Sequence, residues 1–261
     1  MFVKMDDGVR IHVEAEPDNG RPALLFSNSL GTNLHMWDGQ MAPFGEAFRV
    51  VRYDSRGHGR SDAPAGLYTM ERLGRDALAV LDTLGVARAC YCGLSKGGMV
   101  GQWLGAHAGG RIERMALCNT SAYIPAPDLW NTRIEVSTGE GMAALCQGII
   151  ERWFAEEFRN SNPDEIARVR EMVLTTPGHG YAGCCAAIRD MDQRQSTRGI
   201  TVPTLVVAGA KDPATPPEHG REIHALIEGS EFVLLDAAHL SNIERTDEFN
   251  SQVLGFLRRR A

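Results

Sequence analysis

The segment CGLSKGG (residues 92–98) holds a serine between two glycines, in the pattern G-x-S-x-G. The apolar run ACYCG ends just before it, and GGMVGQWLG (residues 97–105) follows with the spacing of a helix. A strand, a sharp turn and a helix in this order form a nucleophile elbow, which exposes the serine hydroxyl. Glycine at positions 93 and 97 permits so tight a turn, because larger side chains would collide with the backbone. We therefore predict that Ser95 is a nucleophile; the alternative interpretation is a serine that only caps a helix.

The chain around this segment contains six short apolar runs of the kind that form buried strands in a parallel sheet. They are ALLFSN (23–28), FRVVRYD (48–54), ARACYCG (87–93), RMALCN (114–119), PTLVVAG (203–209) and EFVLLD (231–236). Helical spacing occurs at 69–85, 97–110, 217–227 and 246–260, and alternation over residues 2–16 predicts a hairpin. We therefore expect an α/β fold with a mostly parallel, doubly wound sheet.

Residues 121–197 interrupt this alternation, because they contain no strong strand pattern. The stretches EGMAALCQGIIERWFAEEF (140–158) and NPDEIARVREMVL (162–174) predict helices. We interpret this all-helical insertion as a cap over the carboxyl edge of the sheet. Residues 1–120 and 198–261 would then form the core, and residues 121–197 the helical cap.

A serine nucleophile needs a general base, and the base needs an acid that orients it. Asp212 follows the strand pattern LVVAG in a loop rich in glycine and proline, and His239 follows the last predicted strand. Both residues come after Ser95 in the chain order serine, acid, histidine that suits this kind of elbow. All three would lie at the carboxyl edge of the sheet, where open α/β sheets bind ligands.

Other acids and histidines fit these roles less well. Asp236 lies only three residues before His239 and is better explained as the end of a strand. His58 lies in the loop DSRGHGRSD, and His35 follows the first apolar run of the sheet. The remaining histidines lack a strand end before them and are better explained as surface residues: His12, His107, His179, His219 and His224.

A tetrahedral intermediate also needs two backbone donors that bind its oxyanion. One is the amide of the residue after the nucleophile, here Lys96. The second comes from the loop SNSLGTNLHMW (27–37), in which the position of Leu30 is the best match. The alternative interpretation of that segment is an ordinary loop that contains a glycine.

Composition excludes several classes of function. The chain has 261 residues and a net charge of −6, which disfavours binding to nucleic acid. No apolar run approaches the roughly 20 residues of a membrane span, and the N-terminus does not resemble a signal peptide. The six cysteines show no C-x-x-C pair, so we expect no zinc site. Without an export signal we expect a cytoplasmic location and thiols that are reduced and mostly buried.

The segments SNSLGTNLHMWDGQ, RVVRYDSRGHGRSDAP, CGLSKGGMVGQWLG, VVAGAKDPATPP and DAAHLSNIE resemble the α/β-hydrolase family. Further segments, LCNTSA, YAGCCAAIRDMD and HLSNIE, resemble the 3-oxoadipate enol-lactonases within that family. The resemblance implies hydrolysis of the enol-lactone of 3-oxoadipate in the catabolism of protocatechuate and catechol. It also implies a small anionic lactone as substrate and no metal or organic cofactor.

Lys96 departs from this resemblance, in which the residue after the serine is commonly methionine. We expect its ammonium to bind the substrate carboxylate, because the substrate is an anion. The alternatives are that the ammonium extends along the helix to an acid, or that it marks another anionic substrate. Arg133, in the segment DLWNTRIE, is the competing carboxylate ligand, because guanidinium binds carboxylates in a bidentate manner. Trp130 and Trp153 are candidates for the pocket wall, although the core of the cap would suit both equally well.

Two other functions remain open at the level of the sequence. One is a carboxylesterase or a hydrolase of carbon–carbon bonds that acts on another, anionic carbonyl substrate, because fold does not determine substrate. The other is a catalytically silent protein that binds a ligand on a hydrolase fold. Epoxide hydrolases and haloalkane dehalogenases are disfavoured, because they use an aspartate where Ser95 stands. The oligomeric state is also open, a homo-oligomer included.

Overall fold

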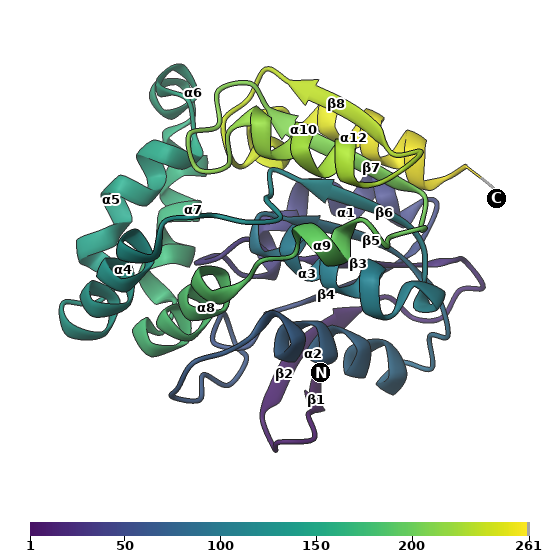
Figure 1. The fold of residues 1–261 in the computed structure, drawn as a ribbon, viewed down its shortest axis with the longest axis horizontal. Coiled ribbons are helices and arrows are strands. Elements are labelled where there is room, and N and C mark those ends of the chain that lie inside the picture. The colour runs from purple at the N-terminus through teal and green to yellow at the C-terminus, as the bar shows by residue number, and fades with distance from the viewer. Residues whose placement is uncertain (260–261) are drawn as a thin grey trace.

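The computed structural model describes residues 1–259 and contains an eight-stranded sheet in the order β1-β2-β4-β3-β5-β6-β7-β8 (Figure 1). The strands are β1 Phe2–Lys4, β2 Arg10–Ala15, β3 Ala23–Ser27, β4 Arg49–Tyr53, β5 Ala89–Leu94, β6 Ile112–Cys118, β7 Thr204–Gly209 and β8 Glu231–Leu235. β1 and β2 form an antiparallel hairpin, and β2 joins β4 in an antiparallel pair. All other neighbours are parallel, so the predicted fold class is confirmed.

Helices cover both faces of the sheet, as a doubly wound fold requires. One face carries α1 (Asp38–Gly45) and α12 (Thr246–Leu257). The short helix α11 (Ser241–Glu244) directly precedes α12 in the sequence and contacts both helices. The other face carries α2 (Met70–Thr83), α3 (Lys96–His107), α9 (Arg194–Thr197) and α10 (Pro217–Leu226). The helix predicted over 246–260 ends at Leu257, and residues 260–261 lie outside the described residues.

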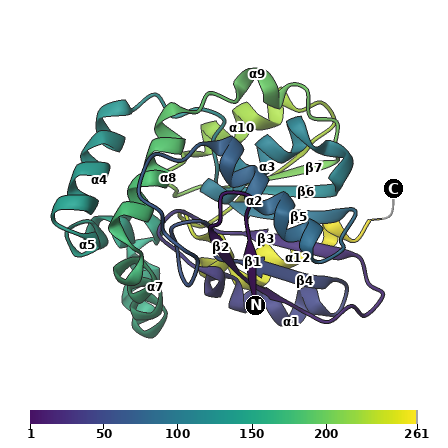
Figure 2. The same ribbon diagram turned by 90° about the horizontal axis from the view of Figure 1, so that it is seen from below.

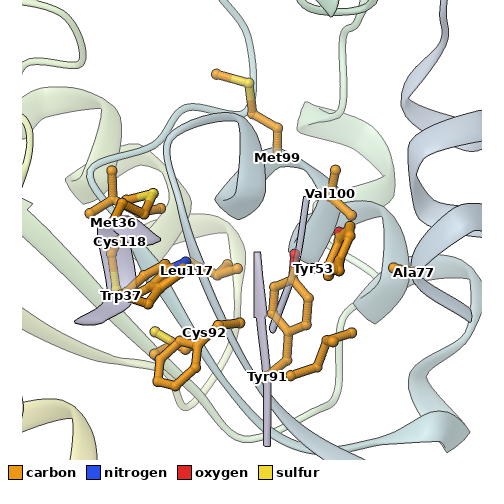
Figure 3. Packing of buried hydrophobic residues seen from close by; sticks show 14 of the residues in the cluster. Met36, Trp37, Tyr53, Ala77, Tyr91, Cys92, Met99, Val100, Leu117 and Cys118 are labelled. Atoms are coloured by element: carbon orange, nitrogen blue, oxygen red, sulfur yellow. The ribbon is translucent and has the colours of Figure 1, made fainter. Parts of the chain in front are cut away.

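Apolar side chains pack on both sides of the central strands (Figure 3). Tyr91 and Cys92 are adjacent in β5 and therefore point to opposite faces. Tyr91 packs on α3, where its hydroxyl donates to the carbonyl of Gly97 at 2.6 Å. On the other face, the indole Nε1 of Trp37 donates to Asn28 Oδ1 at 3.0 Å. The edge strand β8 is less covered, because it has a neighbour on one side only, and Leu234 is 42% exposed.

Between β6 and β7 the chain forms α4 (Pro127–Gly139), α5 (Met142–Trp153), α6 (Glu156–Ser161), α7 (Pro163–Thr175) and α8 (Gly178–Asp190). These helices lie together beyond one end of the sheet, at the left of Figures 1 and 2. The helix predicted over 140–158 is divided in two, because Phe154 and Ala155 are extended. The division of the chain into a core and a cap at residues 121 and 197 stays a prediction.

No helix within residues 1–259 combines the length and the apolar character needed to cross a membrane. The six cysteines are buried and free, as expected.

Candidate active site

Ser95 stands in the sharp turn between β5 and α3. Its backbone has φ 57° and ψ −117°, a conformation that costs energy for a residue with a Cβ. The turn is packed so closely that a Cβ on Gly93 would lie 2.3 Å from the carbonyl oxygen of Gly97. A Cβ on Gly97 would lie 2.1 Å from the carbonyl oxygen of Ser27 in β3. Both glycines of the motif are therefore required by backbone contacts.

Asp212 and His239 meet at the carboxyl edge of the sheet, after β7 and β8 respectively. His239 Nδ1 lies 2.8 Å from Asp212 Oδ2, and both side chains are buried. Burial alone would raise the pKa of the Asp212 carboxyl. The charge and hydrogen bond of His239, together with other donors, outweigh burial and hold that pKa below its ordinary value. Asp212 therefore accepts a hydrogen bond from His239 as a carboxylate. Because Nδ1 makes that bond, Nε2 is the ring nitrogen that could exchange a proton with a reacting group.

One cavity of about 110 Å³ joins the predicted residues. Ser95 and His239 both line it, and Leu30 lines it from the loop after β3. The Trp153 ring stacks on the His239 ring, with centroids 6.3 Å apart. The inserted helices thus form a wall opposite the carboxyl edge of the sheet.

The two predicted oxyanion donors come from the start of α3 and from the loop after β3. The Lys96 amide belongs to the first turn of α3, where the amides of a helix have no partner within the helix. Leu30 borders the cavity, and its amide donates to no other group of residues 1–259. The next amide, that of Gly31, instead donates to His58 Nε2 at 2.9 Å.

The side chain of Lys96 is not where a carboxylate ligand is needed. It does not line the cavity, it is 1% exposed, and its Nζ lies 4.0 Å from Cys184 Sγ in α8. Burial lowers the pKa of this ammonium, while the surrounding thiols and carboxylates oppose that shift. The structure therefore corrects the expectation that Lys96 faces the substrate, since its side chain turns away into the protein.

The cation of the cavity is arginine. Arg133, the competing candidate for the carboxylate ligand, lines the cavity, with its guanidinium 4.8 Å from the centre of the Trp130 ring. Trp130 and Trp153 also line it, and both are buried. The sequence analysis did not single out Arg152, which also borders the cavity. Burial lowers the pKa of Arg152, and the nearby charge of Arg133 lowers it further.

A family model described as the alpha/beta hydrolase fold matches residues 22–246 of this chain. The chain belongs to the α/β-hydrolase family. Two relatives are similar over nearly the whole of this α/β hydrolase. 3-Oxoadipate enol-lactonase 2 of Acinetobacter baylyi is 38% identical over 239 residues, which are 92% of this chain and 90% of that protein. 3-Oxoadipate enol-lactonase 1 of the same organism is 37% identical over 251 residues, covering 96% and 94%.

Comparison with solved structures shows the same similarity. The crystal structure of the enol-lactonase from Burkholderia xenovorans LB400 matches with a TM-score of 0.97 and 43% identity, covering 99% of this chain and 100% of that one. A thermophilic esterase from Thermogutta terrifontis, solved with malate bound, matches with a TM-score of 0.92 and 27% identity, covering 99% and 97%. This α/β hydrolase is therefore an enzyme similar to proteins that cleave lactones and esters.

Two polar residues of the site were missed by the sequence analysis. Thr215 Oγ1 donates to Asp212 Oδ2 at 2.7 Å and lies 3.3 Å from His239 Nδ1. Asn119 Nδ2 donates to Asp212 Oδ2 at 3.0 Å and to the carbonyl of Ala238 at 3.1 Å. Asn119 directly follows β6 with φ 43°, a conformation that asparagine adopts more readily than most residues. A lone asparagine after a predicted strand was the only local signal available.

The residues that were set aside as triad members have other roles in this hydrolase. Asp236 is exposed and forms ion pairs with Lys211 and Arg245. His35 is exposed and pairs with Asp38 at 3.3 Å. His58 is fully buried and does not line the cavity. The expectation that His12 is a surface residue is wrong: its ring is buried, and its Nδ1 lies 2.9 Å from Asp54 Oδ2.

Proposed function

We propose that this enzyme opens the enol-lactone of 3-oxoadipate with water to give 3-oxoadipate, a reaction of the β-ketoadipate pathway. The 3-oxoadipate enol-lactonases that resemble the chain over more than nine-tenths of its length support this activity. The observation that carries the proposal is one cavity lined by Ser95, His239 and two arginines, with Asp212 hydrogen-bonded behind the histidine.

In the first half of the reaction, Ser95 Oγ attacks the lactone carbonyl while His239 Nε2 takes its proton. Asp212 holds the ring with its Nδ1 proton inward and stabilises the imidazolium. The amides of Leu30 and Lys96 bind the oxyanion of the tetrahedral intermediate. When that intermediate collapses, the bond to the ring oxygen breaks, and the enolate, still tethered through the acyl chain, takes the proton held by His239 and becomes the ketone, which returns His239 to its neutral form. A stable enolate makes the leaving group less dependent on general-acid help than an alkoxide would be.

In the second half, His239 takes a proton from a water molecule, and the resulting hydroxide attacks the acyl-serine carbonyl. The same two amides bind the second oxyanion, and Ser95 leaves with the proton that His239 returns. The inserted helices, which we assign as a cap over residues 121–197, provide the wall that closes the cavity.

Charge and size favour a small anionic substrate. Arg133 and Arg152 border the cavity, and neither forms an ion pair with a carboxylate within residues 1–259. Two half-buried cations whose charges repel each other are a binding site for an anion, because a carboxylate relieves that repulsion. A cavity of about 110 Å³ is also well below the roughly 300–1,000 Å³ of sites for drug-sized ligands. The enol-lactone of 3-oxoadipate is small and carries a free carboxylate, so it meets both conditions.

The test is the loss of ultraviolet absorbance of the enol-lactone with the wild type, Ser95→Ala, Arg133→Gln and Arg152→Gln. We expect fast wild-type turnover, and Ser95→Ala should lower kcat by at least about 10³-fold. Each arginine variant should raise KM by about 10- to 100-fold, as expected when a charged hydrogen bond is lost. Arg198→Gln is the matched control, because Arg198 is exposed at the end of α9. A wild type that does not hydrolyse the lactone, or a Ser95→Ala variant with full activity, would contradict the proposal.

A carboxylesterase acting on a small anionic ester is the second candidate. It is favoured by the similarity to the thermophilic esterase, whose structure contains the dianion malate. The same variants distinguish the two functions when neutral and anionic esters are assayed beside the lactone. Turnover of the esters without turnover of the lactone would establish the esterase. A wild type that a serine-reactive phosphonate does not label would instead support a silent binder.

A further inference from the structure

A chain of buried contacts connects the side chain of Lys96, whose amide is one proposed oxyanion donor, with Gly31, which follows the other proposed donor. It begins at Lys96, whose Nζ lies 4.0 Å from Cys184 Sγ. Cys184 Sγ in turn lies 3.6 Å from the carbonyl oxygen of Arg56, and His58 Nδ1 lies 3.1 Å from that same oxygen. On the other side of the ring, His58 Nε2 accepts from the amide of Gly31 at 2.9 Å. Gly31 directly follows Leu30, whose amide is the second proposed donor.

These contacts define the protonation state of His58. The Gly31 amide is a donor, so Nε2 must carry a lone pair. The Arg56 carbonyl is an acceptor, so Nδ1 must carry the proton. Burial of the whole ring lowers the pKa of His58 well below its ordinary value, and the charge of Lys96 lowers it further. A second proton would replace the acceptor with a donor pointing at the Gly31 amide.

The loop that carries His58 is braced on both sides. A Cβ on Gly57 would lie 2.6 Å from the Cα of Gly180 in α8, and a Cβ on Gly59 would lie 2.3 Å from the Asp54 carboxyl carbon. Asp54 Oδ1 accepts from the amide of Leu34 at 2.8 Å. The oxyanion loop is thus tied to this rigid loop at two points, at Gly31 by His58 and at Leu34 by Asp54.

The tie at Gly31 acts on the direction of the neighbouring amide. Gly31 has φ +79°, and a Cβ there would lie 3.3 Å from the Tyr181 ring, so the backbone has little alternative space. A hydrogen bond from the Gly31 N–H fixes the peptide between Leu30 and Gly31. Leu30 lines the cavity that Ser95 also lines, so fixing this peptide limits the directions open to the Leu30 N–H, one peptide earlier.

We propose that His58 is a positioning residue that aims the Leu30 amide at the oxyanion, and that the buried Lys96 ammonium keeps His58 in its neutral, accepting form. This inference rests on the proposed serine-hydrolase function, because an oxyanion must form. It gives Lys96 a role that does not require its side chain to touch the substrate.

Several groups act on this pair from the elements packed around it. Within residues 1–259, Lys96 from α3 is the charged side chain that lowers the pKa of His58. The hydrogen bond to the carbonyl of Arg56, in the loop of His58 itself, opposes that shift. Four groups favour the charged form of Lys96: Cys184 and Cys185 from α8, Asp54 from the loop after β4, and Asp76 from α2. All four oppose the effect of burial, so they help to retain the charge that acts on His58.

The first experiment compares His58→Leu and His58→Gln by steady-state kinetics on the enol-lactone. The leucine removes the acceptor, so kcat should fall by about 10- to 100-fold with KM little changed, less than the effect of deleting an oxyanion donor outright. The glutamine carries an amide oxygen that can accept from Gly31 and should restore most of kcat. Affinity for a small boronic acid, which forms a tetrahedral adduct on the serine, should fall in parallel with kcat.

Thr204→Val is the control for loss of a buried hydrogen bond, because Thr204 Oγ1 donates to the carbonyl of Val202 at the start of β7 and not to the loop that carries Leu30 or the loop that carries His58. It should lower the melting temperature while kcat stays near the wild-type value. Unchanged kcat in a folded His58→Leu variant, or no rescue by glutamine, would overturn the positioning role. A wild type inactive on both lactone and esters would instead overturn the proposed function. In that case, amide hydrogen exchange at Gly31, equal in the wild type and His58→Leu, would overturn the tie itself.

The role of Lys96 has a separate readout in histidine-selective ¹⁵N NMR spectra. The wild-type His58 ring should show the neutral tautomer protonated at Nδ1, and it should stay neutral as the pH falls toward acid unfolding. In folded Lys96→Met, the His58 ring should become protonated at a pH at which the wild-type ring is still neutral, whereas Lys211→Met, which removes an exposed lysine, should behave like the wild type. A His58 ring that stays neutral down to the same pH in Lys96→Met and in the wild type would overturn the role of Lys96.

Discussion

His239 Nδ1 and Asp212 Oδ2 lie 2.8 Å apart, although the two residues are separated by 27 positions and follow different strands. The same carboxylate accepts from the amides of Ala214 and Thr215 at 2.8 and 3.0 Å. Its orientation is therefore determined by the fold before any substrate binds. The hydrogen bond to Asp212 orients the His239 ring in turn, so its Nε2 is the nitrogen that can take the proton of Ser95.

Asp212→Asn tests this relationship, because an amide keeps the shape of the side chain and removes its charge. The imidazolium then loses its stabilising partner and the ring loses its required tautomer. We expect kcat on the enol-lactone to fall by about 10⁴-fold with little change in KM. The control is Asp236→Asn, an exposed acid that pairs with Lys211 and Arg245. If Asp236→Asn lowered kcat more than Asp212→Asn, Asp212 could not be the orienting acid.

Ser95 should combine loss of activity with gain of stability. Its φ of 57° is unfavourable for any residue with a Cβ, and glycine adopts it freely. Ser95→Gly and Ser95→Ala should be equally inactive, but the glycine variant should be more stable than the alanine variant by about 1 kcal/mol. Urea unfolding measures the difference. Equal stability of the two variants would mean that the turn is not strained at Ser95.

Lys96→Met should stabilise the protein, because a buried ammonium without a close carboxylate is replaced by an apolar side chain of similar length. We expect a gain of about 1 kcal/mol or more in the free energy of unfolding at neutral pH. The pKa of Lys96 is lower in the folded protein than its ordinary value of 10.5, so the unfolded chain binds the proton first as the pH falls. Wild-type stability should therefore decline as the pH falls below 10.5 toward the folded pKa.

Lys96→Met should lack that decline, and unfolding curves at several pH values between 7 and 10.5 measure it. Lys211→Met is the control, because Lys211 is exposed. A difference between Lys96→Met and the wild type that does not change with pH would contradict this account of the buried charge.

Asn119 should matter for both stability and catalysis. Its side chain joins the loop of Asp212 to the loop of His239, and its φ of 43° is costly for alanine. We expect Asn119→Ala to be about 2 kcal/mol less stable than the wild type, and Asn119→Gly to recover about 1 kcal/mol of that loss. Both should lower kcat, since neither restores the hydrogen bonds. Full kcat in Asn119→Gly would show that the two loops hold their positions without this side chain.

The core of the fold could be predicted because its signals are local. Each buried strand appears as a short apolar run, and the elbow appears as glycines around a serine. The proposed acid and base were singled out by their place after two predicted strands, since parallel strands end at one edge of a sheet. Even the hairpin at the N-terminus follows from alternation within 15 residues, those from 2 to 16.

The direction of a side chain could not be predicted in the same way. Lys96 turns toward Cys184, which is 88 positions away in the sequence, so no local pattern shows the contact. Arg152 was missed because it lies in an amphipathic helix, where an arginine usually faces solvent. Helix α8 contains Gly178, Gly180 and Gly183, which weaken helix propensity. All three glycines are required by neighbours distant in sequence: Gly178 by the carbonyl of Ser137, Gly180 by Gly57 and Gly183 by the Tyr68 ring.

The contact between Gly57 and Gly180 also limits how this protein can be recombined with its relatives. One glycine belongs to the loop after β4 and the other to the inserted helix α8, and their backbones leave no room for a Cβ on either side. A chimera that takes its inserted helices from another hydrolase would therefore need glycine at both positions, or a second change that separates the two backbones. The inserted helices are exchangeable only as a matched set with the loop of residues 54–62.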